Sequence, residues 1–138
     1  MQIRATQVRD IMTPDPRVIE PGATVREAWA TMKENGFRHL PVVDAGRLVG
    51  VISITDIGRL GATVPAILER TVAQSMTPNP MTMSPDEPIE SAAAQMGLHK
   101  INCLPIIEGD KLVGIVTTYD LLDALVRRLM PRSTRPPE

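Results

Sequence analysis

Two stretches of the chain carry a hydroxyl and a carboxylate at the same spacing behind a glycine. They are Gly50-Val-Ile-Ser-Ile-Thr-Asp56 and Gly114-Ile-Val-Thr-Thr-Tyr-Asp120. Each lies where a β-branched strand is expected to give way to a helix, and the free amides and positive dipole of a helix start suit a phosphate. The Ser or Thr hydroxyl adds a donor, and a carboxylate can accept both hydrogen bonds of a ribose cis-diol. The chemistry that this pattern favours is nucleotide binding.

The same spacing also has a structural interpretation. Ser-x-x-Asp and Thr-x-x-Asp are capping boxes, in which the two side chains satisfy free backbone amides at the start of a helix. Such a cap needs no ligand. Spacing alone therefore leaves both alternatives open.

The two motifs belong to a longer internal repeat with a constant offset of 64 residues. Residues 8–16, Val-Arg-Asp-Ile-Met-Thr-Pro-Asp-Pro, return at 72–80 as Val-Ala-Gln-Ser-Met-Thr-Pro-Asn-Pro, and the correspondence continues without a gap to Asp56 and Asp120. A fixed period predicts two copies of one supersecondary unit that pack on each other. Two related halves also predict two related clefts, where small ligands bind.

Each half is expected to open with a Met-Thr-Pro turn and a short extended piece, residues 17–20 and 81–84. A capping box, Thr24-Val-Arg-Glu27, then starts a helix that ends at Gly36. Apolar residues at i, i+3, i+4 and i+7 predict the core face of this helix and of its copy. They are Val25, Ala28, Trp29 and Met32, repeated as Ile89, Ala92, Ala93 and Met96.

A β-hairpin and a second helix follow in each half. The strands are expected at residues 40–43 and 48–54, and again at 104–107 and 112–117. The helix after the first hairpin is expected to stop at Gly61, before a further helical piece at about residues 65–70. Each repeat is thus strand, helix, strand, strand, helix.

Composition narrows the class of protein. A chain of 138 residues, 43% of them hydrophobic, is expected to form one globular module around one shared core. A net charge of -1 without a basic stripe argues against nucleic-acid binding. The apolar runs are too short to cross a membrane. A single cysteine and the lack of a signal-peptide pattern favour a cytoplasmic location.

Catalysis has little support in the sequence. The chain contains no Gly-x-Ser-x-Gly elbow, Walker loop, His-Glu-x-x-His or Rossmann glycine pattern, so we expect no enzyme activity and no catalytic cofactor. Cys103 and His39 occupy equivalent positions, but no ligand spacing of the Cys-x-x-Cys kind supports a metal site. The expected organisation is an N-terminal segment 1–7, repeat 1 at 8–64, repeat 2 with its linker helix at 65–130, and a disordered tail 131–138.

The repeated motifs together resemble the CBS domain, a family named after cystathionine beta-synthase. The resemblance rests on the Met-Thr-Pro openings, the Leu-Pro-Val-Val and Leu-Pro-Ile-Ile strands and the Gly-x-x-Ser/Thr-x-x-Asp endings, and covers nearly all of residues 8–128 in tandem. It implies an α+β (α/β-type) fold of two β-α-β-β-α repeats packed through their sheets with pseudo-twofold symmetry. It also implies binding of an adenosine-containing ligand, such as AMP, ADP, ATP or S-adenosylmethionine.

The resemblance also assigns roles to individual residues. Asp56 and Asp120 hold the ribose hydroxyls, and Ser53 and Thr117 lie by the phosphate. The base is lined in one cleft by Arg17, Val18 and Ile19 with Leu40 and Pro41, and in the other by Met81, Thr82 and Met83 with Cys103, Leu104 and Pro105.

Basic residues distinguish the two halves. Arg38, His39, His99 and Lys100 can neutralise phosphates, or can be merely solvated. Arg38 and His39 correspond to Asn102 and Cys103 in the second repeat, so the two clefts are expected to differ in charge and affinity.

The expected function is a stand-alone, energy-sensing regulatory module that binds an adenosyl ligand and signals to an unknown effector protein. The resemblance implies a homodimer through the helices, with Leu60, Ile67, Leu68, Leu122 and Leu129 as candidates for its surface. The alternative is a ligand-free scaffold in which Asp56 and Asp120 act only as caps. An enzyme acting on nucleotides is a third and weaker alternative.

Overall fold

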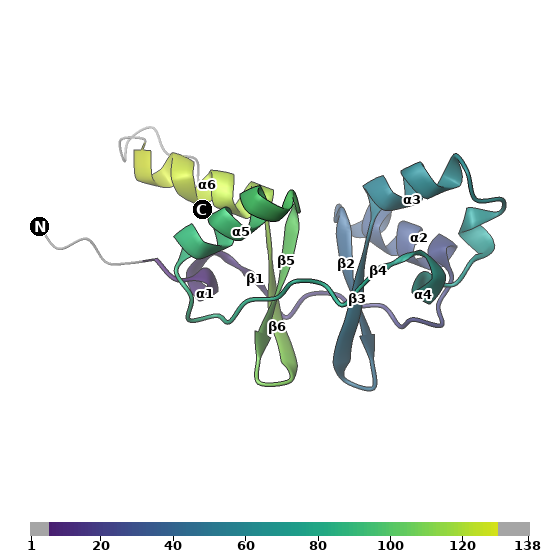
Figure 1. The fold of residues 1–138 in the computed structure, drawn as a ribbon, viewed down its shortest axis with the longest axis horizontal. Coiled ribbons are helices and arrows are strands. Elements are labelled where there is room, and N and C mark those ends of the chain that lie inside the picture. Colours follow the sequence, from purple (N-terminus) through teal and green to yellow (C-terminus); the bar gives the residue numbers. More distant parts are fainter. Residues whose placement is uncertain (1–5, 130–138) are drawn as a thin grey trace, which may run out of the picture. The chain divides into compact units, whose positions relative to one another are not determined.

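The computed structural model describes residues 6–129, so the expected tail lies outside the described residues. The elements of the chain are shown in Figure 1. In order they are α1 (Val8–Ile11), β1 (Thr13–Pro14), α2 (Val25–Asn35), β2 (His39–Asp44), β3 (Arg47–Ser53), α3 (Ile54–Gly61), the 3-10 helix η1 (Ile67–Glu69), α4 (Val72–Ser75), β4 (Thr77–Pro78), α5 (Ile89–His99), β5 (Cys103–Glu108), β6 (Lys111–Thr117) and α6 (Thr118–Leu129).

The chain divides into two compact units that exchange the openings of the two repeats. The Asp56 unit contains residues 16–81 and 110–112, and the Asp120 unit contains, of the described residues, 6–15, 82–109 and 113–129. The segment that opens repeat 1 therefore belongs to the unit of repeat 2, and residues 72–80 belong to the unit of repeat 1. The boundaries proposed from the sequence describe the repeat, whereas the compact units cut across it.

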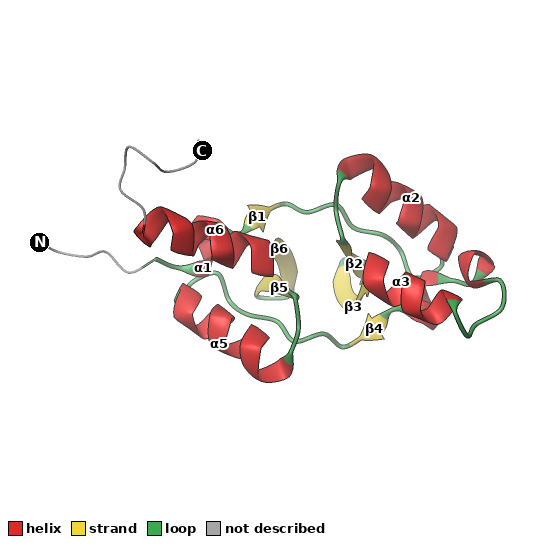
Figure 2. Ribbon diagram, turned by 90° about the horizontal axis from the view of Figure 1, so that it is seen from above, coloured by secondary structure: helices red, strands yellow, loops and turns green. Residues whose placement is uncertain are grey.

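Strand pairing accounts for this exchange. The two sheets have the strand orders β2-β3-β4 and β1-β6-β5, and both are seen in Figure 2. β4 pairs antiparallel with β3, with Gly50 opposite Pro78, and β1 pairs antiparallel with β6, with Gly114 opposite Pro14. The two-residue Thr-Pro strand of each Met-Thr-Pro segment thus satisfies backbone groups along the hairpin of the other repeat.

The Asp56 unit forms as its local sequence predicts. Thr24 caps α2, because its Oγ1 accepts a hydrogen bond from the Glu27 N–H at 3.1 Å, and Gly36 ends the helix in a left-handed conformation with φ of 72°. The β2–β3 turn places Ala45 and Gly46 at positive φ, as tight hairpins with right-handed twist require. The buried apolar residues are Val25, Ala28, Met32, Leu40, Val42, Ile52, Ile57 and Val72.

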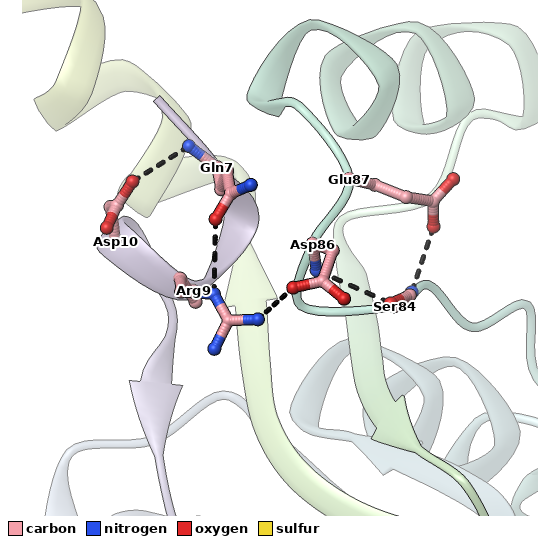
Figure 3. A network of polar contacts seen from close by, with 6 residues as sticks. All are labelled: Gln7, Arg9, Asp10, Ser84, Asp86 and Glu87. Carbon is pink, nitrogen blue, oxygen red and sulfur yellow. Dashed lines mark hydrogen bonds and ion pairs between the residues drawn. The ribbon is translucent and has the colours of Figure 1, made fainter. Parts of the chain in front are cut away.

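The Asp120 unit has its own core and includes the start of the described chain. Its buried apolar residues are Val8, Met83, Ala92, Met96, Leu104, Ile106 and Val116. α1 is tied to the rest of this unit by the ion pair between Arg9 and Asp86, shown in Figure 3. The same view shows the cap of α1, in which the Gln7 N–H donates to Asp10 Oδ2 at 2.8 Å. A cluster of buried apolar residues therefore forms within each unit.

The short extended pieces lie where the sequence predicts them, each as an isolated parallel bridge. The Ile19 N–H donates to the Pro41 carbonyl at 3.0 Å, and the Met83 N–H donates to the Pro105 carbonyl at 3.2 Å. These bonds hold residue 19 beside β2 and residue 83 beside β5.

The apolar face of the first repeat helix is narrower than predicted. Trp29 is 37% exposed, with Lys33 Nζ 4.5 Å from its ring centroid, and its counterpart Ala93 is also exposed. The i+4 position therefore lies at the border of the buried face, and a cation–π contact covers part of the indole. Among residues 6–129, no helix has the length and apolar character needed to cross a bilayer.

Candidate functional site

The first hydroxyl–carboxylate motif lies at the β3–α3 junction of the Asp56 unit. Ser53, the buried last residue of β3, caps α3 because its Oγ accepts a hydrogen bond from the Asp56 N–H at 3.0 Å. Asp56 lies in the first turn of the helix, with its side chain 25% exposed. Its Oδ1 accepts a hydrogen bond from Arg59 Nη2 at 2.8 Å, so this carboxylate is part of an ion pair.

The second motif lies at the β6–α6 junction of the Asp120 unit and is bonded differently. Asp120 Oδ2 accepts from the Thr117 N–H at 2.8 Å and from Thr117 Oγ1 at 3.1 Å. In return, Thr117 Oγ1 accepts from the Asp120 N–H at 3.4 Å. Within the described part of the chain Asp120 has no ion-pair partner, whereas Asp56 has one.

Both motifs cap helices, but capping does not use every hydrogen-bond acceptor of the two carboxylates. Asp56 Oδ2 and Asp120 Oδ1 accept no hydrogen bond from any residue in 6–129. An ionised carboxylate has about four lone-pair sites, so each aspartate retains acceptors for a second role. The capping and ligand-binding alternatives are therefore compatible.

Backbone pairing gathers most of the other predicted residues around each motif. In the Asp56 unit, His39 lies opposite Ser53 in the β2–β3 ladder, and the Arg38 carbonyl accepts from the Ile54 N–H at 3.0 Å. In the Asp120 unit, the Asn102 carbonyl accepts from the Thr118 N–H at 3.0 Å in the same way. The backbone of residue 38 or 102 is thus hydrogen-bonded to the first residue of the helix that carries the aspartate.

The residues proposed to line the base divide by exposure. Those on the strands are mostly buried: Leu40, Pro41, Leu104 and Pro105, with Cys103 partly buried. On the extended pieces, Ile19 is partly exposed and Met83 is buried, while the remaining side chains are exposed, namely Arg17, Val18, Met81 and Thr82. Met81 belongs to the Asp56 unit, whereas the other residues proposed to line the same base belong to the Asp120 unit. The base-lining roles stay a prediction.

Two titratable side chains near the motifs are shifted by burial. Burial lowers the pKa of His39 from its ordinary value, Arg38 lowers it further, and Asp56 opposes both effects. Burial raises the pKa of the Cys103 thiol to about 12, and Asp120 contributes to that rise. At neutral pH His39 is therefore a neutral hydrogen-bonding group rather than a cation, and Cys103 is a protonated thiol.

No cluster of three or more His, Cys, Asp and Glu suited to a metal occurs within residues 6–129.

The glycine of each motif has a role that the sequence analysis did not identify. A Cβ at Gly50 would lie 2.4 Å from Met76 Sδ, and a Cβ at Gly114 would lie 2.3 Å from Met12 Sδ. Only glycine permits this approach, since methionine from each Met-Thr-Pro segment crosses directly over the strand. The recurrence of Met and Gly at the same offset was the available signal.

Comparison with known proteins identifies this tandem α+β architecture. The family model of the CBS domain matches residues 8–61 and 70–127. The chain is 31% identical to the CBS domain-containing protein YhcV of Bacillus subtilis (strain 168) over 116 residues, which cover 84% of this chain and 83% of that protein. The chain therefore belongs to the CBS domain family, and the resemblance found in its sequence is confirmed.

Solved structures of CBS domain pairs have the same fold. The CBS domain pair of protein MJ0100, in complex with 5′-methylthioadenosine and S-adenosyl-L-methionine, matches with a TM-score of 0.82 and 31% identity, covering 88% of this chain and 97% of that one. CBSX2 in complex with AMP matches with a TM-score of 0.79 and 27% identity, covering 90% of this chain and 99% of that one. Four curated relatives at 32% to 39% identity carry enzyme names, and the chain spans only 23% or 24% of their length.

Proposed function

We propose that the chain is a regulatory module that binds an adenosine-containing ligand, namely AMP, ADP, ATP or S-adenosylmethionine, and passes the signal to a partner protein. The observation that carries this proposal is the unused carboxylate oxygen of Asp56 and of Asp120 beside a hydroxyl at a strand-to-helix junction. Related CBS pairs solved with AMP, or with 5′-methylthioadenosine and S-adenosyl-L-methionine, support the ligand class.

In this proposal the ribose cis-diol donates to the free aspartate oxygens, and Ser53 and Thr117 lie by the phosphate or its substituent. A ligand that contacts both the extended piece and the helix start favours the arrangement of these segments that it fits best. It shifts the equilibrium only by its differential affinity for the two states. Micromolar binding makes about 8 kcal/mol available, which is ample for a bias of a few kcal/mol. The module itself catalyses no reaction.

The test is thermal unfolding with each ligand at saturating concentration. AMP, ADP, ATP or S-adenosylmethionine should raise the Tm, because a ligand at 100 times its Kd adds about 2.7 kcal/mol to the stability of the native state. Free adenine and ribose 5-phosphate serve as fragment controls. A Tm unchanged by all four ligands contradicts the proposal.

The second candidate function is a ligand-free scaffold. The observation that favours it is that both hydroxyls already serve as caps within the chain, with Ser53 bonded to Asp56 and Thr117 bonded to Asp120. The unchanged Tm described above is the result that this candidate predicts.

We also propose that the module acts in the cytoplasm as a homodimer formed through its helices. Of the five candidates for the dimer surface, Ile67 and Leu68 pack on the core of the Asp56 unit, and Leu60 is partly buried. Leu122 and Leu129 on α6 are 55% and 75% exposed, as an unpaired apolar face would be. Sedimentation velocity should give twice the monomer mass, and Leu122→Lys should reduce it to the monomer.

A further inference from the structure

The two candidate sites differ in charge at three equivalent positions. Arg17, Arg38 and Arg59 accompany Asp56, and the repeat offset replaces them by Met81, Asn102 and Asp123 around Asp120. Each exchange removes an arginine, and the last introduces an acid. A loss of positive charge at three positions is expected if the two sites accept ligands of different charge.

The polar contacts of the two aspartates follow the same division. Asp56 is paired with Arg59, whose side chain is 73% exposed. At the position equivalent to Arg59, Asp123 Oδ2 accepts a hydrogen bond from Arg127 Nε at 3.0 Å. Asp120 instead accepts both of its hydrogen bonds from Thr117. Asp120 therefore lacks the cationic contact that Asp56 has.

The causes of the pKa shifts of His39 and Cys103 indicate which charged side chains lie near each site. Position 39 is influenced by both Arg38 and Asp56, so a cation and a carboxylate act on the same point beside Ser53. The equivalent Cys103 is influenced by Asp120. Arg17 is two residues from Ile19, which is bonded to Pro41 of β2.

We propose that the Asp56 site selects adenosine ligands that carry a phosphate, whereas the Asp120 site selects adenosyl ligands without a net negative charge, such as a thioether or sulfonium nucleoside. This inference rests on the proposed function and deepens it. Arginine binds phosphate through paired hydrogen bonds, and Arg17, Arg38 and Arg59 supply three such groups. A ribose that binds the free Oδ2 of Asp56 leaves Arg59 able to exchange its exposed ion pair for the phosphate, and an exposed ion pair offers little resistance to this exchange. At the Asp120 site, the equivalent positions hold Met81, Asn102 and Asp123, which supply no arginine.

The experiment measures each site separately by isothermal titration calorimetry at pH 7.5, where His39 is neutral. Asp56→Asn and Asp120→Asn each disable one site, and AMP and 5′-methylthioadenosine are the probes, since both are adenosine derivatives and only AMP is anionic. AMP binding should survive in Asp120→Asn and be lost in Asp56→Asn. Binding of 5′-methylthioadenosine should show the reverse pattern.

Substitutions that give one repeat the charged or uncharged residue of the other test whether charge causes the difference in ligand selection. Arg38→Asn and Arg59→Gln should each weaken AMP at least tenfold and leave 5′-methylthioadenosine unchanged, and Asn102→Arg should strengthen AMP at the Asp120 site. Arg47→Asn is the matched control, because Arg47 is an exposed arginine of the same unit at the start of β3. It should leave both affinities unchanged, and circular dichroism should show that all variants fold.

Two results overturn the inference in distinguishable ways. If both probes bind but either aspartate variant loses them equally, or if Arg38→Asn and Arg59→Gln bind AMP as Arg47→Asn does, charge selection is wrong and the proposed function stands. If neither probe binds the unmodified protein, the proposed function fails and the inference fails with it.

Discussion

His39 makes the stability of the Asp56 unit depend on pH. Burial and Arg38 lower its pKa in the folded protein, so below the unfolded value of about 6.5 the unfolded chain binds a proton that the folded chain resists. This contribution to stability is present above that value and is lost as the pH falls. Urea unfolding between pH 7.5 and 5 should show a smaller loss of stability for His39→Gln than for the unmodified protein.

Cys103 is expected to be chemically inert despite being the one cysteine of the sequence. With a pKa of about 12, its thiolate fraction at pH 8 is on the order of 10⁻⁴. Intact-mass spectrometry after treatment with iodoacetamide at pH 8 should show an unmodified folded protein and rapid addition of one group in 8 M urea. Equal rates in the two conditions would mean that the thiol is not protected by burial.

Asp120 is expected to combine a structural and a binding role. Asp120→Ala removes the acceptor for two Thr117 donors and should cost about 1 kcal/mol of stability, the usual size of a capping contribution. If the same carboxylate holds the ribose diol, the variant loses affinity for ribose-containing ligands far more than for free adenine. Calorimetry with 5′-methylthioadenosine and with adenine measures both, and equal losses would refute the diol role.

The strand crossings depend on the glycines that open the two motifs. Gly50→Ala and Gly114→Ala each place a methyl group within 2.5 Å of a methionine sulfur and close to a strand carbonyl, so one of the two segments must move. Overpacking of this kind costs about 1–3 kcal/mol. Gly22→Ala, where a Cβ meets nothing within 4 Å, is the control. Denaturant unfolding should rank both crossing variants well below it, and a loss no larger than that of the control would contradict the close approach.

The helices and hairpins show how local sequence acts. The Thr24 cap, the left-handed Gly36 and the turn at Ala45 and Gly46 lie where the residue types predict, because each depends on contacts within a few residues. The exposure of Trp29 was not predictable in this way. Periodicity identifies the side of a helix that is apolar, but the neighbours in space decide how wide the buried face is.

The exchange of opening segments determines how the molecule as a whole responds to mutation. Val8 is fully buried in the core of the Asp120 unit although it opens repeat 1, and Val72 is fully buried in the core of the Asp56 unit although it opens repeat 2. Val8→Ala should cost about 2 kcal/mol through lost burial and a residual cavity. Hydrogen exchange should rise in α5, β5 and β6, not in α2, β2 and β3, and Val72→Ala should give the opposite pattern. If hydrogen exchange increased only in the repeat that carries the mutation, the assignment of each opening segment to the other unit would be contradicted.

The amino-acid sequence alone determined the two-fold repetition, the order of elements and the positions of the aspartates and their hydroxyls. These features are readable because period, capping and turn chemistry are local and each occurs twice. It also identified the family, since the motifs recur in order with a constant offset. The charge difference at position 38 likewise follows from residue types alone, because the repeat offset pairs Arg38 with the amide Asn102.

Only the tertiary structure decided which segments share a core and why the motif glycines are required. A repeat has the same local sequence whether its first strand pairs with its own hairpin or with that of its copy, so pairing across the chain cannot be read from periodicity. The glycines are required because a methionine that is distant in the sequence, Met76 for Gly50 and Met12 for Gly114, packs on them only in the folded chain.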